Sequence, residues 1–468
     1  MLIALTPTTD PSKIMGKGAY IRIQNKSTHT VTVSVEDRVL IDNVGMDMIQ
    51  GTVEAGGSLP SDGEEKFGNG HRYQYIEGDK GFFLQPDGSF KLTVTTEGSS
   101  PGFAMLHVGA NDWWSGDCGV GGEVMVSTDV EECGDNFRIE VRIFNVIHTK
   151  TWMADLAECI KDKPLCCVGL PGTHDSGTFT FDKGLGASAD SDLTMTIQKN
   201  LDGDGNRGIF GSIGSVINDQ ILGTVYSSLC KTQHKTIKEQ LEGGIRYFDL
   251  RIVRHEESGK FYTCHGVFCA DAKTVMDEIN EFLNENTKEI VLLDVNHLFM
   301  MDGHHRRFVD DVMATLGNKV ANFKKLKARS TVGEFWEAGA QAVILYCQEE
   351  KIGPYKGKLW SQDEIRSPWP NTTDINILHD KLNENVEQRC KDKFFVLQGL
   401  LTPDGNLIKD EILSNNVNTS LETIAKRVSC KVVDWVEDEW HDQSHNVVIV
   451  DFFEKCSIVP TIINWNRK

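Results

Sequence analysis

Two histidines stand where an apolar segment gives way to a loop: His174 in LPGTHDSGT and His265 in FYTCHGV. Two imidazoles with ordinary pKa values of about 6.5 can act as base and acid around one phosphodiester. One removes a proton from the attacking hydroxyl and the other protonates the leaving oxygen. A single histidine is more often structural or solvated, so the prediction depends on the residues around the pair.

The triplet Asp249-Leu250-Arg251 lies between the two histidines in a segment with the composition of a strand. Alternate side chains of a strand point the same way, so we expect Asp249 and Arg251 to face one side together. An arginine in that place can hold a phosphoryl oxygen and neutralise the charge that develops in the transition state. The combination predicts acid–base cleavage of a phosphate diester.

The overall charge argues against a nucleic-acid partner. The 468 residues include 48 Lys plus Arg and 68 Asp plus Glu, a formal charge of −20. Such a surface repels the phosphates of nucleic acids, and it offers anionic membranes no general basic field. A local pocket or an apolar loop can still engage lipid.

No apolar run approaches the roughly 18 residues that a membrane span requires. Residues 2–5 form an apolar run too short for the core of a signal peptide. We therefore expect no transmembrane segment and a cytoplasmic protein that is peripheral at membranes. Secretion without a recognisable signal peptide is the alternative.

Twelve cysteines are scattered along the chain without CxxC pairs or metal-ligand spacing. We expect most of them to be reduced and buried. Cys118 and Cys133 lie in a Gly-rich, acidic stretch, and for this pair a disulfide stays open.

The first part of the chain, residues 1–147, has the residue pattern of a β protein. The runs AYIRIQN, HTVTVSVED, FKLTVTTEG, GEVMVST and FRIEVRIFN alternate with period two and are separated by turn residues, a pattern typical of antiparallel strands. We expect a β-sandwich that acts as a binding or regulatory module. Trp113 and Trp114 could line a binding surface, but a core position is the more common place for such a pair.

Residues 148–468 alternate apolar strand-like runs with helical segments. The strand-like runs are CCVGLPG, IRYFDLRIV, EIVLLDVNHL, QAVILYCQ, FFVLQGLL and NVVIVDFF. Val275, Ile279, Phe282 and Leu283 fall on one helical face, as a helix that covers a sheet requires. This alternation predicts a parallel (β/α) barrel with GTHDSG, DLR, HG and NVVIVD on one rim.

The motifs LPGTHDSGT, TQHKTIKEQLEGGIRYFDLRI and CHG, in this order and spacing, resemble the catalytic X domain of phosphatidylinositol-specific phospholipase C. LWSQDEIRSPWPNTTD, FFVLQGLLTP and NVVIVDFF resemble its single-X-domain branch, so the resemblance covers about 151–468. It implies a TIM-like barrel and a phospholipid substrate at a membrane surface. The implied products are diacylglycerol and a cyclic inositol phosphate.

The resemblance also implies roles for single residues. His174 would be the general base on the inositol 2-hydroxyl, and His265 the general acid on the diacylglycerol oxygen. Asp175 would pair with His265 and orient it, and Arg251 would stabilise the phosphate.

Two further residues match the family near the substrate. Asp451 falls near the inositol ring, and Phe453 stands where bacterial members often carry an aromatic hydroxyl. In EIVLLDVNHL, Asp294 and Asn296 would share a strand face, but neither aligns securely with a family residue.

The pattern of Asp249, Arg251 and Asp175 resembles that of the metal-independent bacterial members, so we expect no metal and no cofactor. Calcium-dependent members instead carry carboxylates that suit a hard cation. The segment LDGDGN at 201–206 begins like a calcium loop but lacks the glycine and the final glutamate, which leaves calcium as the minor alternative.

An insert at about 182–229 lengthens the loop after the first catalytic strand. Its apolar part could enter a lipid surface, or it could pack as a helix on its own barrel. Two other functions stay open beside the first: cleavage of another glyco- or lysophospholipid diester, and a lipid-binding adaptor that uses the β-sandwich.

Overall fold

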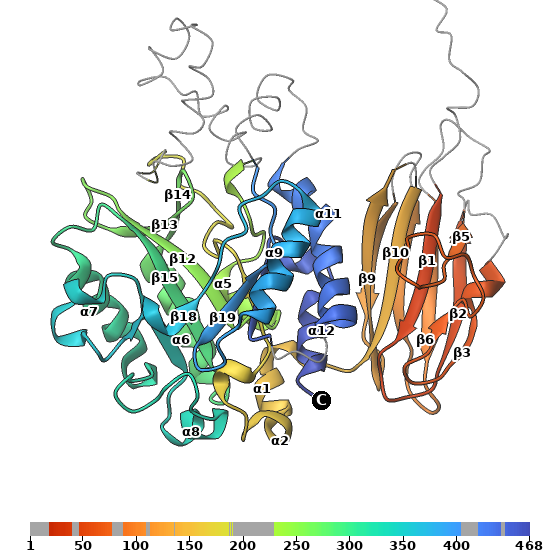
Figure 1. Cartoon of the computed structure of the whole chain (residues 1–468), viewed down its shortest axis with the longest axis horizontal. Coiled ribbons are helices and arrows are strands. Elements are labelled where there is room, and N and C mark those ends of the chain that lie inside the picture. The colour runs from red at the N-terminus through yellow and green to blue at the C-terminus, as the bar shows by residue number, and fades with distance from the viewer. Residues whose placement is uncertain are drawn as a thin grey trace, which may run out of the picture. The chain divides into compact units, whose positions relative to one another are not determined.

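A computed structural model describes residues 18–39, 46–76, 88–108, 113–134, 136–186, 188, 190, 229–403, 420–440 and 445–468. The chain divides into two compact units, Met1–Ile147 and His148–Lys468, drawn in Figure 1. Most of the expected insert, with its apolar segment and the LDGDGN loop, lies outside the described residues.

The first unit contains two five-stranded sheets. One has the order β4 (Ser58–Leu59), β1 (Ala19–Asn25), β10 (Asn136–Asn145) and β9 (Val124–Cys133), with β5 (Gln74–Ile76) also paired to β1. The other has the order β3 (Gly51–Val53), β2 (Val31–Val39), β6 (Gly88–Thr95), β7 (Gly102–Val108) and β8 (Trp113–Gly119).

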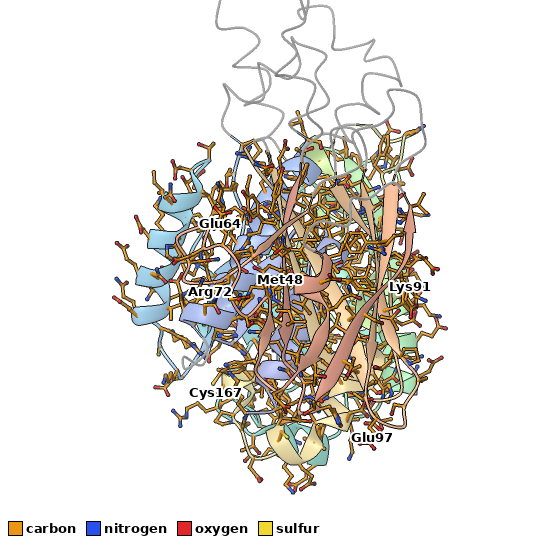
Figure 2. All side chains as sticks on the ribbon, turned by 90° about the vertical axis from the view of Figure 1, so that its right-hand side faces the viewer. Met48, Glu64, Arg72, Lys91, Glu97 and Cys167 are labelled. Atoms are coloured by element: carbon orange, nitrogen blue, oxygen red, sulfur yellow. The ribbon has the colours of Figure 1, made fainter. Side chains whose placement is uncertain are left out.

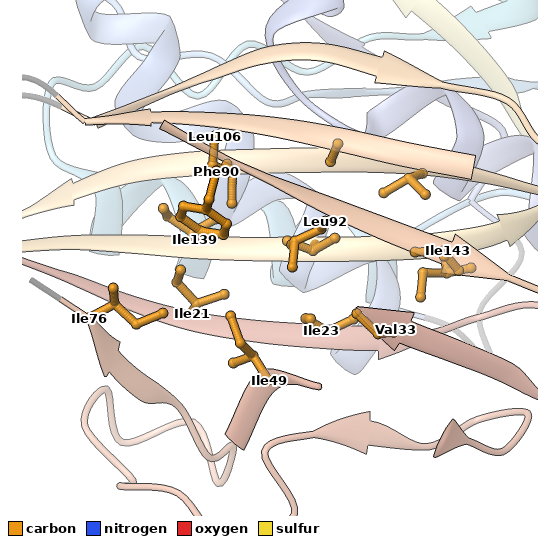
Figure 3. Close-up of a cluster of buried hydrophobic side chains, with 14 of the residues drawn as sticks. Ile21, Ile23, Val33, Ile49, Ile76, Phe90, Leu92, Leu106, Ile139 and Ile143 are labelled. Atoms are coloured by element: carbon orange, nitrogen blue, oxygen red, sulfur yellow. The ribbon is translucent and has the colours of Figure 1, made fainter. Parts of the chain in front are cut away.

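One apolar cluster takes side chains from both sheets. Figure 3 shows Ile21, Ile139 and Ile143 from the first sheet in one cluster with Phe90 and Leu92 from the second. Burial of this much branched aliphatic surface is the main force that holds two such sheets together. Polar and charged side chains such as Glu64, Arg72 and Glu97 are exposed on this unit, as is Met48 (Figure 2).

The strand pairing corrects one expectation for this unit. Among the described residues, the strand pairs of this unit are antiparallel except that β1 runs parallel to β10, with Ile21 opposite Ile139. These are the first and last strands of the unit, so no tight hairpin joins them and a parallel pairing is open to them. The side chains of Trp113 and Trp114 lie outside the described part of the structure.

The cysteines are less uniformly buried than expected. Cys118 lies on β8 and Cys133 on β9, in different sheets, and the Cys118 thiol is 3.4 Å from the Thr128 hydroxyl. Half of the twelve cysteines are buried, namely Cys166, Cys230, Cys264, Cys269, Cys430 and Cys456.

The second unit is a nearly closed barrel of eight parallel strands. Around it the order is β17 (Trp360–Ser361), β16 (Ala342–Tyr346), β15 (Val291–Phe299), β12 (Tyr247–Arg254), β11 (Leu170–Thr173), β20 (Val447–Val450), β19 (Phe394–Gln398) and β18 (Ile365–Arg366). The six expected strands are all present. The two-residue strands β17 and β18 were not predicted, because a pair of residues carries no periodicity.

The helices of this unit alternate with its strands in the chain (Figure 1). Val275, Ile279, Phe282 and Leu283 are all buried on α6, as their spacing predicted. The helices are α1 (Trp152–Asp155), α2 (Ala157–Ile160), α5 (Ile237–Glu242), α6 (Ala272–Glu285), α7 (His305–Leu316), α8 (Val332–Glu337), α9 (Ile375–Glu387), α11 (Leu421–Asp434) and α12 (Ile458–Trp465). No helix among the described residues is long and apolar enough to cross a membrane.

An antiparallel excursion departs from the expected strand–helix alternation. Strand β13 (Phe261–Cys264) pairs antiparallel with the far end of β12, and β14 (Phe268–Asp271) pairs with β13. His265 therefore follows a strand that returns along β12, not a barrel strand as the sequence had suggested. This return brings His265 back toward Arg251.

A buried ion pair links the amino-terminal ends of two barrel strands. Arg246 precedes β12 in the chain and Glu289 precedes β15 by two residues. The Arg246 Nη2 atom lies 2.7 Å from Glu289 Oε2. The carboxylate of Glu289 also accepts hydrogen bonds from the amides of Met153 and Ala154 on α1. One side-chain pair thus ties two strands and the first helix together.

Arg246→Met should lower the free energy of unfolding by about 3–5 kcal/mol, because it leaves the Glu289 carboxylate buried without its charge partner. Arg329→Ala is the matched control, since the Arg329–Asp392 pair is equally short at 2.7 Å but exposed, and it should change little. Urea unfolding followed by tryptophan fluorescence measures both. Similar small losses for the two variants would contradict this role of the buried pair.

Candidate active site

The loop after β11 carries His174 and Asp175 and is held in place by hydrogen bonds with the buried side chain of Gln240 on α5. The Thr173 hydroxyl donates to Gln240 Oε1 at 2.8 Å, and Gln240 Nε2 donates to the carbonyl of Ser176 at 2.9 Å. A Cβ on Gly177 would lie only 2.4 Å from Thr263 of β13. Glycine is therefore required where this loop meets the β13 strand.

A second set of contacts comes from the segment before α5. Gln233, which is fully buried, donates from Nε2 to the carbonyl of His174 at 3.1 Å. The Thr232 hydroxyl donates to the same carbonyl at 3.0 Å. TQHKT belongs to the motif that resembles the family, but its positioning role could not be predicted from the sequence, because it depends on long-range contacts.

His174 is held at one ring nitrogen by a carboxylate from the last barrel strand. Its Nδ1 lies 2.9 Å from Asp451 Oδ1. Burial by itself lowers the pKa of His174, but the charges of Asp175 and Asp451 and the Asp451 hydrogen bond raise it to about 9. Burial raises the pKa of Asp451, and His174 opposes this. Asp451, expected near the substrate ring, thus contacts the first histidine directly.

His265 is held in a similar way, but by a neutral group. Its Nδ1 lies 2.8 Å from the backbone carbonyl of Cys230. A carbonyl oxygen only accepts hydrogen bonds, so Nδ1 carries the proton and donates it. The rings of His174 and His265 lie 6.2 Å apart, centroid to centroid.

The Asp175 carboxylate lies between the two imidazoles. Its Oδ2 is 3.3 Å from His174 Nε2 and 3.5 Å from His265 Nε2, and its Oδ1 is 2.6 Å from Arg251 Nε. Burial would raise the pKa of Asp175, but the Arg251 and histidine charges lower it to about 2. Asp175 therefore faces both histidines and Arg251, a wider role than the expected pairing with His265.

Asp249 and Arg251 reach the same end of the barrel, as the alternation of β12 predicted. Asp249 accepts a hydrogen bond from the backbone amide of Asp175 at 3.1 Å and one from Asn296 Nδ2 at 2.5 Å. Arg251 Nη1 also lies 3.6 Å from the buried carboxylate of Asp190. Asp190 belongs to the described edge of the insert, and no motif in the sequence signalled it.

The barrel interior holds a further polar group opposite Asp249. Asp294 is the partner of Asp249 across β15 and β12. It is fully buried and accepts hydrogen bonds from the Tyr247 hydroxyl at 2.6 Å and from Gln362 Nε2 at 3.0 Å. Burial raises its pKa to about 6, and hydrogen bonds from Tyr247, Gln362 and Asn296 oppose this rise. Asn296 therefore acts on both Asp249 and Asp294.

The structure places Phe453, expected near the substrate, beside the end of α5. The ring is buried, and a Cβ on Gly243 at the end of α5 would lie 2.9 Å from it. Phe453 thus packs against the end of α5. The turn after β20 bends Phe452 into a left-handed conformation with φ of 47°, which redirects the following residue.

Three residues offer ligand atoms for a metal ion within the described part of the chain. One atom each from His174, Asp175 and Asp249 lies within 4.8 Å of the others. These atoms already have partners: Arg251 lies against Asp175, and Asn296 and the Asp175 amide donate to Asp249. An arginine charge at 2.6 Å opposes a cation at the same carboxylate.

The arrangement can bind and cleave a phosphate diester. Each histidine has Nδ1 fixed by an acceptor and turns Nε2 toward a common space beside Arg251. A proton acceptor, a proton donor and a fixed positive charge are the groups that such a cleavage needs.

No family model matches the chain. The PI-PLC X domain-containing protein 3 of Mus musculus is 30% identical over 330 residues, which cover 69% of this chain and 95% of the relative. The chain belongs to the PI-PLC X domain-containing protein family. The human PI-PLC X domain-containing protein 3 gives the same identity and coverage. The human PI-PLC X domain-containing protein 2 is 30% identical over 57% of this chain and 82% of its own length.

Two solved structures of bacterial phospholipases also match this PI-PLC X-domain chain. The phosphatidylinositol-specific phospholipase C from Listeria monocytogenes covers 69% of this chain and 100% of its own, with 18% identity and a TM-score of 0.45. A Staphylococcus aureus phosphatidylinositol-specific phospholipase C covers 69% and 98%, with 15% identity and a TM-score of 0.45.

Asp451→Asn should lower the pKa of His174 from about 9, because it removes a carboxylate that favours the imidazolium. A folded-state pKa above the unfolded value of about 6.5 means that the imidazolium stabilises the fold below about pH 6.5. This stabilisation is lost as the pH rises through about 9.

Titration of the imidazole by NMR measures the change in this X-domain protein. Asp155→Asn is the control, because Asp155 contacts the exposed His148 at 3.1 Å and should leave the His174 midpoint in place. An unchanged midpoint in Asp451→Asn would contradict the assigned carboxylate–imidazole contact.

Proposed function

We propose that the protein cleaves phosphatidylinositol-type lipids to diacylglycerol and a cyclic inositol phosphate by acid–base catalysis. One observation carries the proposal: two imidazoles with fixed Nδ1 atoms turn their Nε2 atoms, 3.3 and 3.5 Å from Asp175 Oδ2, to one space beside Arg251. Membership of the PI-PLC X-domain family supports this substrate class.

In this mechanism His174 is the general base. Its Nε2 takes the proton of the inositol 2-hydroxyl as that oxygen attacks phosphorus, and the Asp451 carboxylate on Nδ1 stabilises the imidazolium that forms. The phosphorus–oxygen bond to diacylglycerol breaks. His265 gives its Nε2 proton to the leaving oxygen, and the product is a five-membered cyclic phosphate.

Arg251 would hold the phosphate while these protons move. In the free site its Nε lies against Asp175, while no hydrogen bond donated by its Nη2 is found within the described residues. A guanidinium can bind Asp175 through one edge and a phosphate oxygen through the other. Asp175 would then fix the arginine and stay close to both histidines through the reaction.

We propose that the reaction needs no metal ion, because the arginine supplies the positive charge at the phosphate. We also propose that the protein meets its lipid as a peripheral protein from the cytoplasm. For the first unit we propose a β-sandwich that acts as a binding or regulatory module, which its two sheets with a common apolar cluster support.

His174→Ala and His265→Ala should each reduce turnover on phosphatidylinositol vesicles by about 10² to 10⁴ while the fold persists, because acid–base terms have this size. His379→Ala is the control, since its imidazole bonds Glu439 on the helical layer. Turnover near that of the unmodified protein in either active-site variant would refute the two-histidine mechanism.

The pH profile of kcat/KM tests for two titrating groups, because it reports the free enzyme. A base that must be free of its proton and an acid that must carry one give a bell-shaped profile with two macroscopic pKa values. His174, whose pKa is raised to about 9, should contribute one of its limbs. A profile without two limbs would contradict acid–base catalysis by two histidines.

Arg251→Lys should reduce turnover by about 10² or more, because lysine keeps the charge but loses the planar fork that holds two oxygens. Arg254→Lys on the same strand is the matched control. The unmodified protein should keep its rate in excess chelator. A protein that is silent in chelator and restored by calcium would contradict the metal-free mechanism, and His174, Asp175 and Asp249 would become ligand candidates.

A further inference from the structure

Strand β15 contains an irregularity beside the active site. Asp249 and Leu250 of β12 pair with Asp294 and Val295, but the next residue, Arg251, pairs with His297. Asn296 is therefore an extra residue on β15. Bulges of this kind change the direction of a side chain and are frequent next to active sites.

The bulge brings His297 to the side of the sheet that carries Arg251. Residues that are partners across a parallel pair point to the same face, so the His297 imidazole lies on the face of the phosphate-binding arginine. In its protonated form His297 also lowers the pKa of the Asp175 carboxylate. Unlike its neighbours in the mouth, His297 is exposed.

A chain of hydrogen bonds fixes the orientation and protonation of this imidazole. Asn296 Nδ2 donates to Asp249 Oδ1 at 2.5 Å, so the amide turns its oxygen to His297 Nδ1, 2.7 Å away. An amide oxygen only accepts, and Nδ1 must therefore carry the proton of the neutral ring. Nε2 is left as an acceptor, and no partner for it is found among the described residues.

The charges around His297 decide which ligand its Nε2 suits. Arg251 contacts the carboxylates of Asp175 and Asp190, and Asp249 accepts a hydrogen bond from the Asp175 amide. In the proposed function Arg251 binds the phosphodiester. A further anionic substituent would meet carboxylates here. A neutral hydroxyl can instead donate its hydrogen to Nε2.

We infer that His297 is a headgroup-binding residue whose Nε2 accepts a hydrogen bond from a ring hydroxyl of the polyol in the substrate. Asn296 and Asp249 are its positioning residues. The inference rests on the proposed function and names a specificity contact for it. It explains why the bulge lies where the diester would bind, one residue beyond Asp249.

Three substitutions separate a ligand contact from a structural one. His297→Ala removes both ring nitrogens and should lower kcat/KM on phosphatidylinositol vesicles about 3- to 10-fold, the range of one neutral hydrogen bond. The effect should fall on KM, since the contact exists before and during the reaction. His297→Gln can place an amide oxygen near Nε2 and should restore most of the loss. His297→Asn reaches only the position of Nδ1 and should behave like His297→Ala.

Inhibition by free myo-inositol gives a second readout. The concentration that halves the rate should rise in His297→Ala and His297→Asn and stay near the starting value in His297→Gln. His255→Ala is the matched control, because His255 lies in the turn after the neighbouring strand β12 and bonds Ser258 through Nδ1. Circular dichroism and the unfolding midpoint show whether each variant is folded.

The outcomes separate this inference from the proposed function. Rescue by asparagine but not by glutamine would overturn the inference, since the ring would then serve only to hold Asn296. Kinetics like those of the unmodified protein in all three variants would overturn it too. An unmodified protein that cleaves no phosphatidylinositol would instead refute the proposed function, and the headgroup role with it.

Discussion

The contact between the Asp175 carboxylate and the Arg251 guanidinium is the interaction on which the rest of the site depends. Asp175 is almost completely buried, and an isolated charge in that place would be strongly unfavourable. Arg251 at 2.6 Å and the two imidazoles at 3.3 and 3.5 Å make the ionised form favourable instead. The same contacts fix the distances between the histidines and the arginine, so one buried carboxylate sets the geometry of the whole site.

The surrounding fold keeps this carboxylate where three cationic groups can meet it. Asp175 follows β11 in a left-handed conformation with φ of 41°, which an L residue adopts only when its neighbours enforce it. Asp249 binds its backbone amide, and Gln233 and Thr232 hold the preceding carbonyl. These anchors lie on or beside β12 and α5, elements whose position is set by the barrel core. The strain of one loop residue is thus balanced by contacts from rigid elements.

The motifs in the sequence were enough to predict the barrel and six residues that the structure brings together. His174, Asp175, Asp249, Arg251, His265 and Asp451 each follow a strand-like run or lie within one. The motifs were insufficient where a contact depends on how distant segments of the chain are arranged in three dimensions. The return of β13 along β12 and the parallel pairing of β1 with β10 depend on the order of strands in the sheets. The position of Phe453 depends on the turn after β20. Gln233 and Asp190 lie in segments without periodicity. The bulge at Asn296 leaves the sequence pattern of β15 unchanged while it alters which side chains face the site.

The charge balance of the site limits how it can work. Asp175, Asp249, Asp190 and Asp451 lie close to one guanidinium and two imidazoles, and with its pKa of about 9 His174 carries a positive charge near pH 7. In the proposed mechanism this charge favours the arrival of an anionic diester but keeps the base occupied by a proton. The carboxylate of Asp451 would therefore have opposite effects on two steps, since it strengthens the base in the transition state and reduces the fraction of free enzyme that can act as base. The second histidine meets a neutral carbonyl instead of a carboxylate, and we propose that these unequal partners distinguish the acid from the base.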